Sequence, residues 1–121
     1  MANQQLIPGP DHPITVQPHA GRVTVRLGDT VVADTTAALE LQESTYPVAY
    51  YLPIADVDRA MLRDSGTTTY CPYKGTASYY SVAVGEQVVD DVIWFYPQPY
   101  DAVADIVEHV AFYPNKVEIA A

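Results

Sequence analysis

The segment from Thr67 to Gly75 holds the densest group of side chains that could take part in chemistry. It contains threonine hydroxyls, the thiol of Cys71, the ammonium of Lys74 and two tyrosine rings. The thiolate is the reactive form of cysteine and a nearby ammonium lowers a thiol pKa, so Cys71 and Lys74 form a candidate catalytic pair. The opposing interpretation is a buried, inert Cys71, because free cysteines are among the most buried residues.

Lys74 also suits the binding of an anion. It is one of only six basic residues and precedes Gly75, where a ligand carboxylate or phosphate would meet exposed backbone N–H groups. An ion pair with a nearby carboxylate and simple solvation are the alternatives. Arg22 and Arg26 share the polar face of one predicted strand and are candidates for a second anion contact, again with solvation as the alternative.

Ten tyrosines are the most unusual feature of the composition, and two pairs are adjacent, Tyr50 with Tyr51 and Tyr79 with Tyr80. Adjacent residues of a strand face opposite sides, so one member of each pair fills the core and the other lies on the second face. An aromatic second face predicts a stacking pocket for a flat ligand, with ordinary core and edge packing as the alternative. The predicted ligand-binding residues are Tyr70, Tyr73, Lys74, Ser78, Tyr80 and Trp94.

The remaining motifs point to no metal or cofactor. The spacing of His12, His19 and His109 suggests no shared metal, and we expect ordinary surface or capping roles for them. The chain has no phosphate-binding glycine loop, nucleophile elbow or metalloprotease helix motif. We therefore expect neither a metal site nor a cofactor.

Alternation of apolar and polar residues predicts a chain made mainly of strands. The segment 35–43 is ambiguous between strand and helix, and we prefer strand because strand signals flank it. The predicted strands are 22–27, 30–34, 35–43, 46–52, 78–84, 89–96 and 116–119, with hairpin turns at Gly28-Asp29 and Gly85-Glu86.

Two helices and one long loop complete the predicted elements. A short helix is expected over Asp56 to Arg63, capped by Asp56, and a longer one over Asp101 to Val110, whose apolar residues form one stripe. Asp64 to Thr76 lacks periodicity and reads as an irregular loop, and loops of this length are often functional.

The length of 121 residues fits one domain. Residues 1–21 contain four prolines, which block helix and central strand, and we expect an extended arm followed by a single β-rich domain over 22–121. The N-terminus lacks the features of a signal peptide and no apolar run suffices for a membrane helix, so we expect a cytoplasmic protein without a membrane partner.

The charge and the cysteine count exclude several classes of protein. Six basic and fifteen acidic residues give a net charge of −9, which repels DNA and RNA, and no nucleic-acid partner is expected. A single cysteine excludes an internal disulfide framework and zinc sites that need two or four cysteines.

Three stretches resemble a known family, the domain of unknown function family 427. They are Val31-Val32-Ala33-Asp34, Tyr50-Tyr51-Leu52-Pro53 with Asp56-Val57, and above all Thr69-Tyr70-Cys71-Pro72-Tyr73-Lys74-Gly75 followed by Ala77-Ser78-Tyr79-Tyr80. The likeness runs from about Arg22 to Val117. It implies a β-tent, in which two antiparallel sheets meet at an angle, and no established activity. Some β-tent proteins hold zinc with four cysteines, and this chain departs from that pattern.

The preferred functional hypothesis is a binding module for a small anionic or planar metabolite. The alternatives are a thiol-dependent enzyme that uses Cys71 with Lys74, and a protein-interaction domain whose tyrosines contact another chain. The identity of the ligand, the reaction if there is one, and the oligomeric state stay open at this point.

Overall fold

The alternating segments form antiparallel strands in the computed structural model, which describes residues 4–121. In β2, Val23, Val25 and Leu27 are buried and the two residues between them are not, as the alternation predicts. The strands of residues 4–121 are, in chain order, β1 (Ile14–Pro18), β2 (Val23–Leu27), β3 (Thr30–Thr35), β4 (Leu39–Glu43), β5 (Ala49–Pro53), β6 (Leu62–Cys71), β7 (Gly75–Val84), β8 (Gln87–Phe95), β9 (His109–Phe112) and β10 (Glu118–Ala120). Short 3-10 helices are η1 (Ile54–Asp56), η2 (Arg59–Met61) and η3 (Asp101–Ile106).

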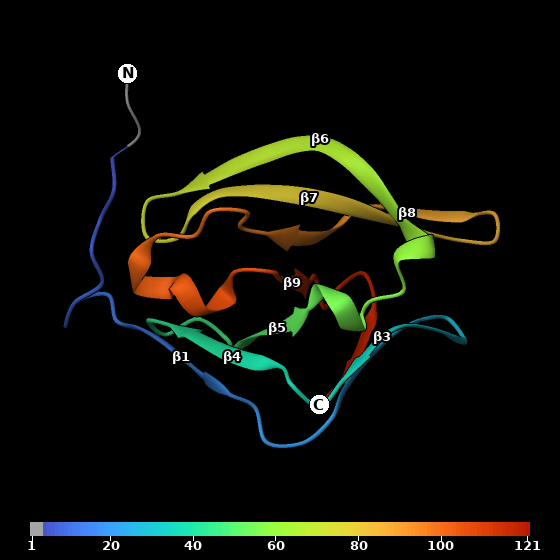
Figure 1. The fold of residues 1–121 in the computed structure, drawn as a ribbon, viewed down its shortest axis with the longest axis horizontal. Helices are drawn as coiled ribbons and strands as arrows, with labels where there is room; N and C mark the ends of the chain where they lie inside the picture. Colours follow the sequence, from blue (N-terminus) through green and yellow to red (C-terminus); the bar gives the residue numbers. More distant parts are fainter. Residues whose placement is uncertain (1–3) are drawn as a thin grey trace.

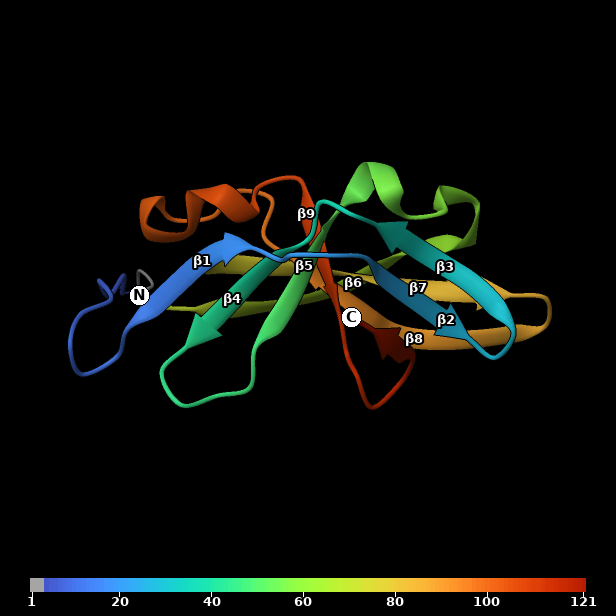
Figure 2. The same cartoon turned by 90° about the horizontal axis from the view of Figure 1, so that it is seen from below.

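These strands build two antiparallel sheets. The larger sheet has the order β1-β4-β5-β9-β8-β7-β6, and the smaller has the order β10-β2-β3. Figure 1 shows β6, β7 and β8 above, β1 and β4 below, and β5 and β9 between them. Viewed from below, β2 and β3 lie on the opposite side of the molecule from β1 and β4 (Figure 2). The fold is mainly β, and β9 joins the two halves of the larger sheet.

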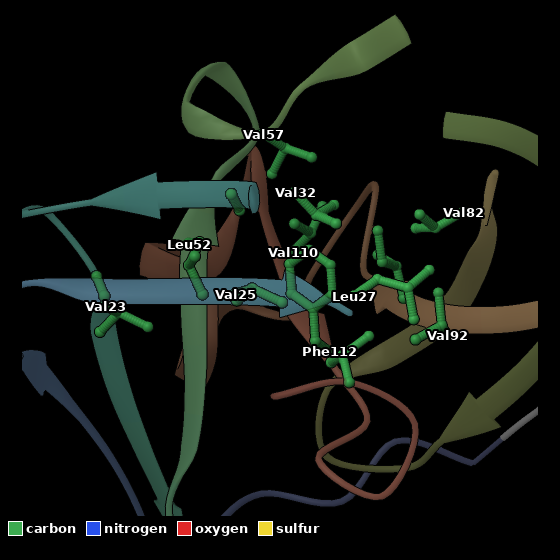
Figure 3. Close-up of a cluster of buried hydrophobic side chains, with 14 residues drawn as sticks. Val23, Val25, Leu27, Val32, Leu52, Val57, Val82, Val92, Val110 and Phe112 are labelled. Carbon is green, nitrogen blue, oxygen red and sulfur yellow. The ribbon is translucent and has the colours of Figure 1, made fainter. Parts of the chain in front are cut away.

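The core consists of two apolar clusters on either side of β9. Val110 and Phe112 belong to the first, which we call the valine cluster, and Ala111 between them belongs to the second, the tyrosine cluster. Figure 3 shows how side chains from both sheets meet in the valine cluster, which comprises Val23, Val25, Leu27, Val32, Ala33, Ala38, Leu52, Val57, Val82, Val92, Ile93, Val110, Phe112 and Val117. The tyrosine cluster comprises Leu41, Tyr51, Ala77, Tyr79, Tyr96, Val103, Ile106 and Ala111.

The two adjacent tyrosine pairs divide between these clusters. Tyr51 and Tyr79 are buried in the tyrosine cluster, whereas Tyr50 and Tyr80 are partly buried against the valine cluster. The prediction that neighbours face opposite sides is therefore confirmed. Both faces of β5 and β7 are packed, so these strands bury aromatic rings on either side of the sheet.

The predicted helix over Asp56 to Arg63 is wrong. Two single turns, η1 and η2, occupy the region, and the capping residue is Asp58, whose carboxylate accepts a hydrogen bond from the Ala60 N–H at 3.1 Å. Asp56 instead accepts a hydrogen bond from the hydroxyl of Thr35 at 2.7 Å, so its side chain fastens this segment to the end of β3.

The predicted longer helix over Asp101 to Val110 is also wrong. The turn η3 ends at Ile106 and is interrupted at Val103, whose backbone is not helical. Val103 and Ile106 are buried as the apolar stripe predicts, but Val110 lies in β9. Branched side chains disfavour helix slightly, and pairing of β9 with β5 and β8 supplies the backbone hydrogen bonds that a longer helix would have provided.

The irregular loop predicted over Asp64 to Thr76 is a hairpin. Strands β6 and β7 pair from Leu62 with Val82 to Cys71 with Gly75, and only residues 72–74 form the turn. Periodicity is weak in β6 because a register shift between Asp64 and Thr68 interrupts the pairing and most of its side chains face solvent at the sheet edge.

The segment 35–43 contains strand β4, in agreement with the preferred interpretation. Residues 14–18 of the predicted N-terminal arm form β1, which pairs with β4 at an edge of the larger sheet. An edge position tolerates Pro18, which has no N–H to donate. Residues 1–3 of that arm lie outside the described part of the chain. No helix within residues 4–121 is long and apolar enough to cross a membrane.

Candidate functional site

A hollow of about 430 Å³ opens beside β4 and β5, and we call it the first hollow. Strand β4 contributes its last residue, Glu43, while β8 contributes Trp94 and the β6–β7 turn contributes Lys74. Apolar and aromatic side chains form nearly all of the wall. The complete lining is Leu41, Glu43, Tyr46, Pro47, Val48, Ala49, Tyr50, Tyr51, Lys74, Trp94, Phe112, Pro114 and Ile119.

Glu43 is the centre of the charged end of this hollow. One of its carboxylate oxygens accepts a hydrogen bond from the Lys74 ammonium, and the other lies 2.8 Å from Nε2 of His12. Burial raises the pKa of Glu43, but hydrogen bonds and charge from Lys74 and His12 outweigh it and hold that pKa below its ordinary value. The carboxylate therefore stays ionised although only 14% of its side chain is exposed.

His12 also holds the turn that carries Lys74. Its imidazole stacks on the ring of Tyr73 with centroids 4.1 Å apart and planes 11° apart. The backbone N–H of Leu6 donates to the carbonyl of Pro72 at 2.9 Å, so the N-terminal segment fastens the turn at a second point. The expected surface or capping role for His12 is corrected: its imidazole joins Glu43 of β4 to Tyr73 of the turn.

Gly75 lets the turn approach the segment before η3. Its φ of +115° lies in the region that favours glycine, and a Cβ there would stand 3.2 Å from the carbonyl oxygen of Gln98. The N–H of Tyr100 donates to the Lys74 carbonyl at 3.0 Å. Contacts on both sides thus give residues 72–75 one defined shape.

The aromatic wall is built around the single tryptophan. Nε1 of Trp94 donates a hydrogen bond to the hydroxyl of Tyr51 at 3.0 Å, and the indole packs against Tyr113 with centroids 4.5 Å apart. Burial raises the pKa of Tyr51 well above its usual range, so its hydroxyl stays protonated. At the rim, Tyr46 is 58% exposed. This wall is largely apolar and carries the Tyr51 hydroxyl and the Trp94 N–H as its polar groups.

Cys71 ends β6 and Lys74 lies in the β6–β7 turn, but only Lys74 lines the first hollow. The thiol is half-buried, packs against the tyrosine cluster and does not line the first hollow, whereas the Lys74 ammonium is bound to Glu43. The structure therefore does not bring the two proposed catalytic groups together in one cavity.

The other predicted ligand-binding residues are distributed over several places. The Tyr70 hydroxyl lies 2.8 Å from that of Tyr100, and this hydrogen bond, with some desolvation, raises the pKa of Tyr70 to about 12. Ser78 lines a separate hollow with Gly75 and Tyr100. Tyr80 lines yet another hollow with His109. Of the predicted set, only Lys74 and Trp94 line the first hollow. Tyr73 is not in the lining but stacks on His12, which binds Glu43.

The other two candidate anion contacts lie in the smaller sheet and outside the first hollow. Arg22 forms an exposed ion pair with Asp34 at 2.8 Å, and Arg26 is an exposed residue of β2. His19, for which a surface or capping role was expected, binds the carboxylate of Glu40 at 2.6 Å. Within residues 4–121, no group of three or more His, Cys, Asp or Glu side chains is arranged to hold a metal ion.

Sequence reasoning missed Glu43 and His12. Each stands 31 positions from its partner in the network, and neither belongs to a motif. The only available signal was that a lysine in an acidic chain has many carboxylates to pair with. As arranged, Lys74, Glu43 and His12 form one network of hydrogen bonds at the end of the first hollow, and the Cys71 thiol lies outside that hollow.

Comparison with known proteins identifies a family and names no reaction. The model of a family described as a domain of unknown function, DUF427, matches residues 15–121. No curated protein matches the chain. The match covers all ten strands except the first residue of β1.

Proposed function

The chain belongs to the DUF427 family of domains of unknown function, and from this premise we propose that it is a small-molecule binding module. The first hollow would hold a planar metabolite against its aromatic wall, with a polar or anionic end of the ligand directed to Lys74. The observation that carries this proposal is one cavity in which an aromatic wall meets a single lysine–glutamate pair.

The wall supports a flat ligand. Trp94 and Tyr51, which both line the hollow, meet edge to face at 85° with centroids 6.2 Å apart. Binding sites for small molecules are typically apolar with a few placed polar groups, and this hollow has that character. Stacking on an aromatic wall favours planar ligands over branched aliphatic ones.

The charged end supports a ligand with an anionic or hydrogen-bonding group. Glu43 has a second partner in His12, so its carboxylate remains hydrogen-bonded if Lys74 turns toward a ligand. The Lys74 side chain is only 12% exposed, and the interaction of an ammonium with an anion strengthens where water is partly excluded. Lys74 would therefore share its hydrogens between Glu43 and the ligand.

The predictions of location, fold type and alternative functions stand beside this proposal and do not support it. We place the protein in the cytoplasm and describe its two antiparallel sheets as a β-tent. The thiol-dependent enzyme gains no support, because Cys71 lies outside the hollow. A protein-interaction role would use the exposed rim at Tyr46 and Val48, and it predicts binding of a chain in place of a small molecule.

Two measurements test the proposal. Native mass spectrometry of the purified protein would reveal a retained metabolite, and NMR titration with 2-naphthoate, a planar anion, would locate binding. Because Trp94 is the only tryptophan, its indole N–H gives one signal that reports directly on the wall. We expect 2-naphthoate to move that signal and to raise the unfolding temperature, because a ligand that prefers the folded state stabilises it.

The matched variants are Lys74→Met and Lys116→Met. Both remove one positive charge, but Lys116 lies outside the lining and donates to the carbonyl of Asp90 at 3.0 Å. Lys74→Met should weaken 2-naphthoate binding about tenfold, as expected for a charge-assisted hydrogen bond, and Lys116→Met should leave it unchanged. An unmoved indole signal, or equal losses in the two variants, would contradict the proposed site.

A further inference from the structure

We propose that the chain carries a second binding site, separate from the first hollow, for a small planar carboxylate. The site is a hollow of about 350 Å³ on the side of the molecule where η2 and the start of β9 meet β7 and β8. Its lining shares no residue with the first hollow. The residues that carry the argument are Arg59, Tyr80, Phe95, Glu108 and His109.

A preformed aromatic surface forms one wall of this second hollow. The rings of Tyr80 and Phe95, from neighbouring strands β7 and β8, stack with centroids 4.6 Å apart and planes 15° apart. Both rings are partly buried against the valine cluster, so packing holds them in place before a ligand arrives. A rigid aromatic pair binds a planar ring with little loss of conformational entropy.

Arg59 supplies a guanidinium that no carboxylate occupies. Within residues 4–121 it forms no ion pair, whereas Arg22 is paired with Asp34 and Arg63 donates to the carbonyls of Ala60 and Leu62. The planar fork of a guanidinium matches a carboxylate with two parallel hydrogen bonds. Arg59 thus gives the lining of this hollow an arginine that is free to bind a ligand carboxylate.

His109 is held in one orientation beside it. Its Nδ1 lies 2.8 Å from the carbonyl oxygen of Val107, and because a carbonyl only accepts, Nδ1 carries the hydrogen. In the neutral ring Nε2 then accepts hydrogen bonds, so it suits a donor group of a ligand and not the carboxylate itself.

The rim next to this histidine is fixed by backbone. Glu108 has φ of +61°, which is uncommon for a residue with a side chain, and its carbonyl accepts from the Ile54 N–H at 2.9 Å. The carboxylate of Glu108 and the guanidinium of Arg59 are both exposed, so water screens the repulsion of an anion by Glu108, and a ligand carboxylate would bind through direct hydrogen bonds to Arg59. The ligand class that fits a rigid aromatic wall beside a free guanidinium is an aromatic carboxylate.

NMR titration with benzoate and with benzamide, its neutral analogue, tests this inference on the intact chain. We expect benzoate to move the backbone amide signals of Glu108 and His109, whether or not the Trp94 indole signal also moves, and benzamide to bind at Glu108 and His109 at least about tenfold more weakly. The Trp94 indole signal reports on binding in the first hollow and the His109 amide signal on binding in the second, so each proposal can be rejected without the other.

Arg59→Gln and Arg63→Gln are the matched variants, since both remove one exposed guanidinium from the same segment. Arg59→Gln should lower benzoate affinity at least about tenfold, and Arg63→Gln should change it less than about twofold. Equal binding of benzoate and benzamide, equal effects of the two variants, or no movement at Glu108 and His109 would each overturn the second site.

Discussion

Lys74 donates a hydrogen bond to the carboxylate of Glu43 and thereby ties the β6–β7 turn to the end of β4. The two residues come from opposite halves of the larger sheet, which are otherwise connected through β9. The same carboxylate binds His12, so three segments far apart in the chain converge on one anion. This convergence defines the charged end of the first hollow, and several measurable consequences follow from it.

Replacing Glu43 by Gln should destabilise the protein by about 1–3 kcal/mol, because a poorly exposed ammonium loses its ionised partner. Urea unfolding monitored by Trp94 fluorescence measures the change. Glu86→Gln, in the exposed turn between β7 and β8, removes the same charge without a partner in the network and should be nearly neutral. Similar losses in both variants would show that the Glu43 contacts contribute little.

The stability of the folded state should fall in acid partly through Glu43. Its pKa lies below the ordinary value, because Lys74 and His12 outweigh the effect of burial, so the folded state binds this proton less tightly than the unfolded chain. The stabilisation is complete above the ordinary glutamate pKa of about 4.3 and is lost as the pH falls through the lower folded value.

This pH dependence is measured by urea unfolding of the wild type and of Glu43→Gln at a series of pH values. The difference in unfolding free energy between them should be largest at neutral pH and should shrink below about pH 4.3. A difference that is constant across the series would mean that the carboxylate titrates alike in both states.

Tyr51→Phe should destabilise the protein by about 1–2 kcal/mol, because the Trp94 N–H would lose its acceptor at the base of the hollow. The indole N–H signal should also shift. Tyr46→Phe removes a hydroxyl from a side chain that is 58% exposed, and it serves as the control with little expected change. If the indole signal stayed in place in Tyr51→Phe, the hydrogen bond would be excluded.

Gly75→Ala should destabilise the hairpin by about 1–3 kcal/mol, because its φ of +115° is strained for alanine and the new Cβ meets the Gln98 carbonyl. Gly66→Ala in the neighbouring strand is a matched control, since a Cβ there would contact nothing within 4 Å. Thermal unfolding compares the two variants. An equal midpoint for both would show that the turn can relax.

Alkylation of Cys71 by iodoacetamide should be at least about tenfold slower in the folded protein than in urea, because the thiol packs against the tyrosine cluster. The chain has one cysteine, so intact mass spectrometry reports on this site alone. Fast labelling of the folded protein near neutral pH would instead revive the thiol-dependent alternative.

Local sequence pattern was enough to predict most of the strands and to predict that the two tyrosines of each adjacent pair lie on opposite faces of their strand. A period of two residues reflects burial of one face of a strand, and β2 and the first part of β7 show it clearly. Composition also drew attention to the region of Lys74, since lysine, glycine and aromatic residues occur together there, although that region was predicted to be part of an irregular loop. The resemblance to family 427, which depended most on the cysteine-containing stretch, is confirmed by a family model that matches residues 15–121.

Only tertiary structure decided the helices, the long hairpin and the site. The stripe at Val103 and Ile106 is compatible with helix or with turn, and pairing of β9 on both sides selected the turn and strand. Strand β6 carries no clear alternation because its partner β7, rather than its own burial, holds it in place. Glu43 and His12 join Lys74 through contacts between distant segments, and local residue pattern carries no information about such contacts.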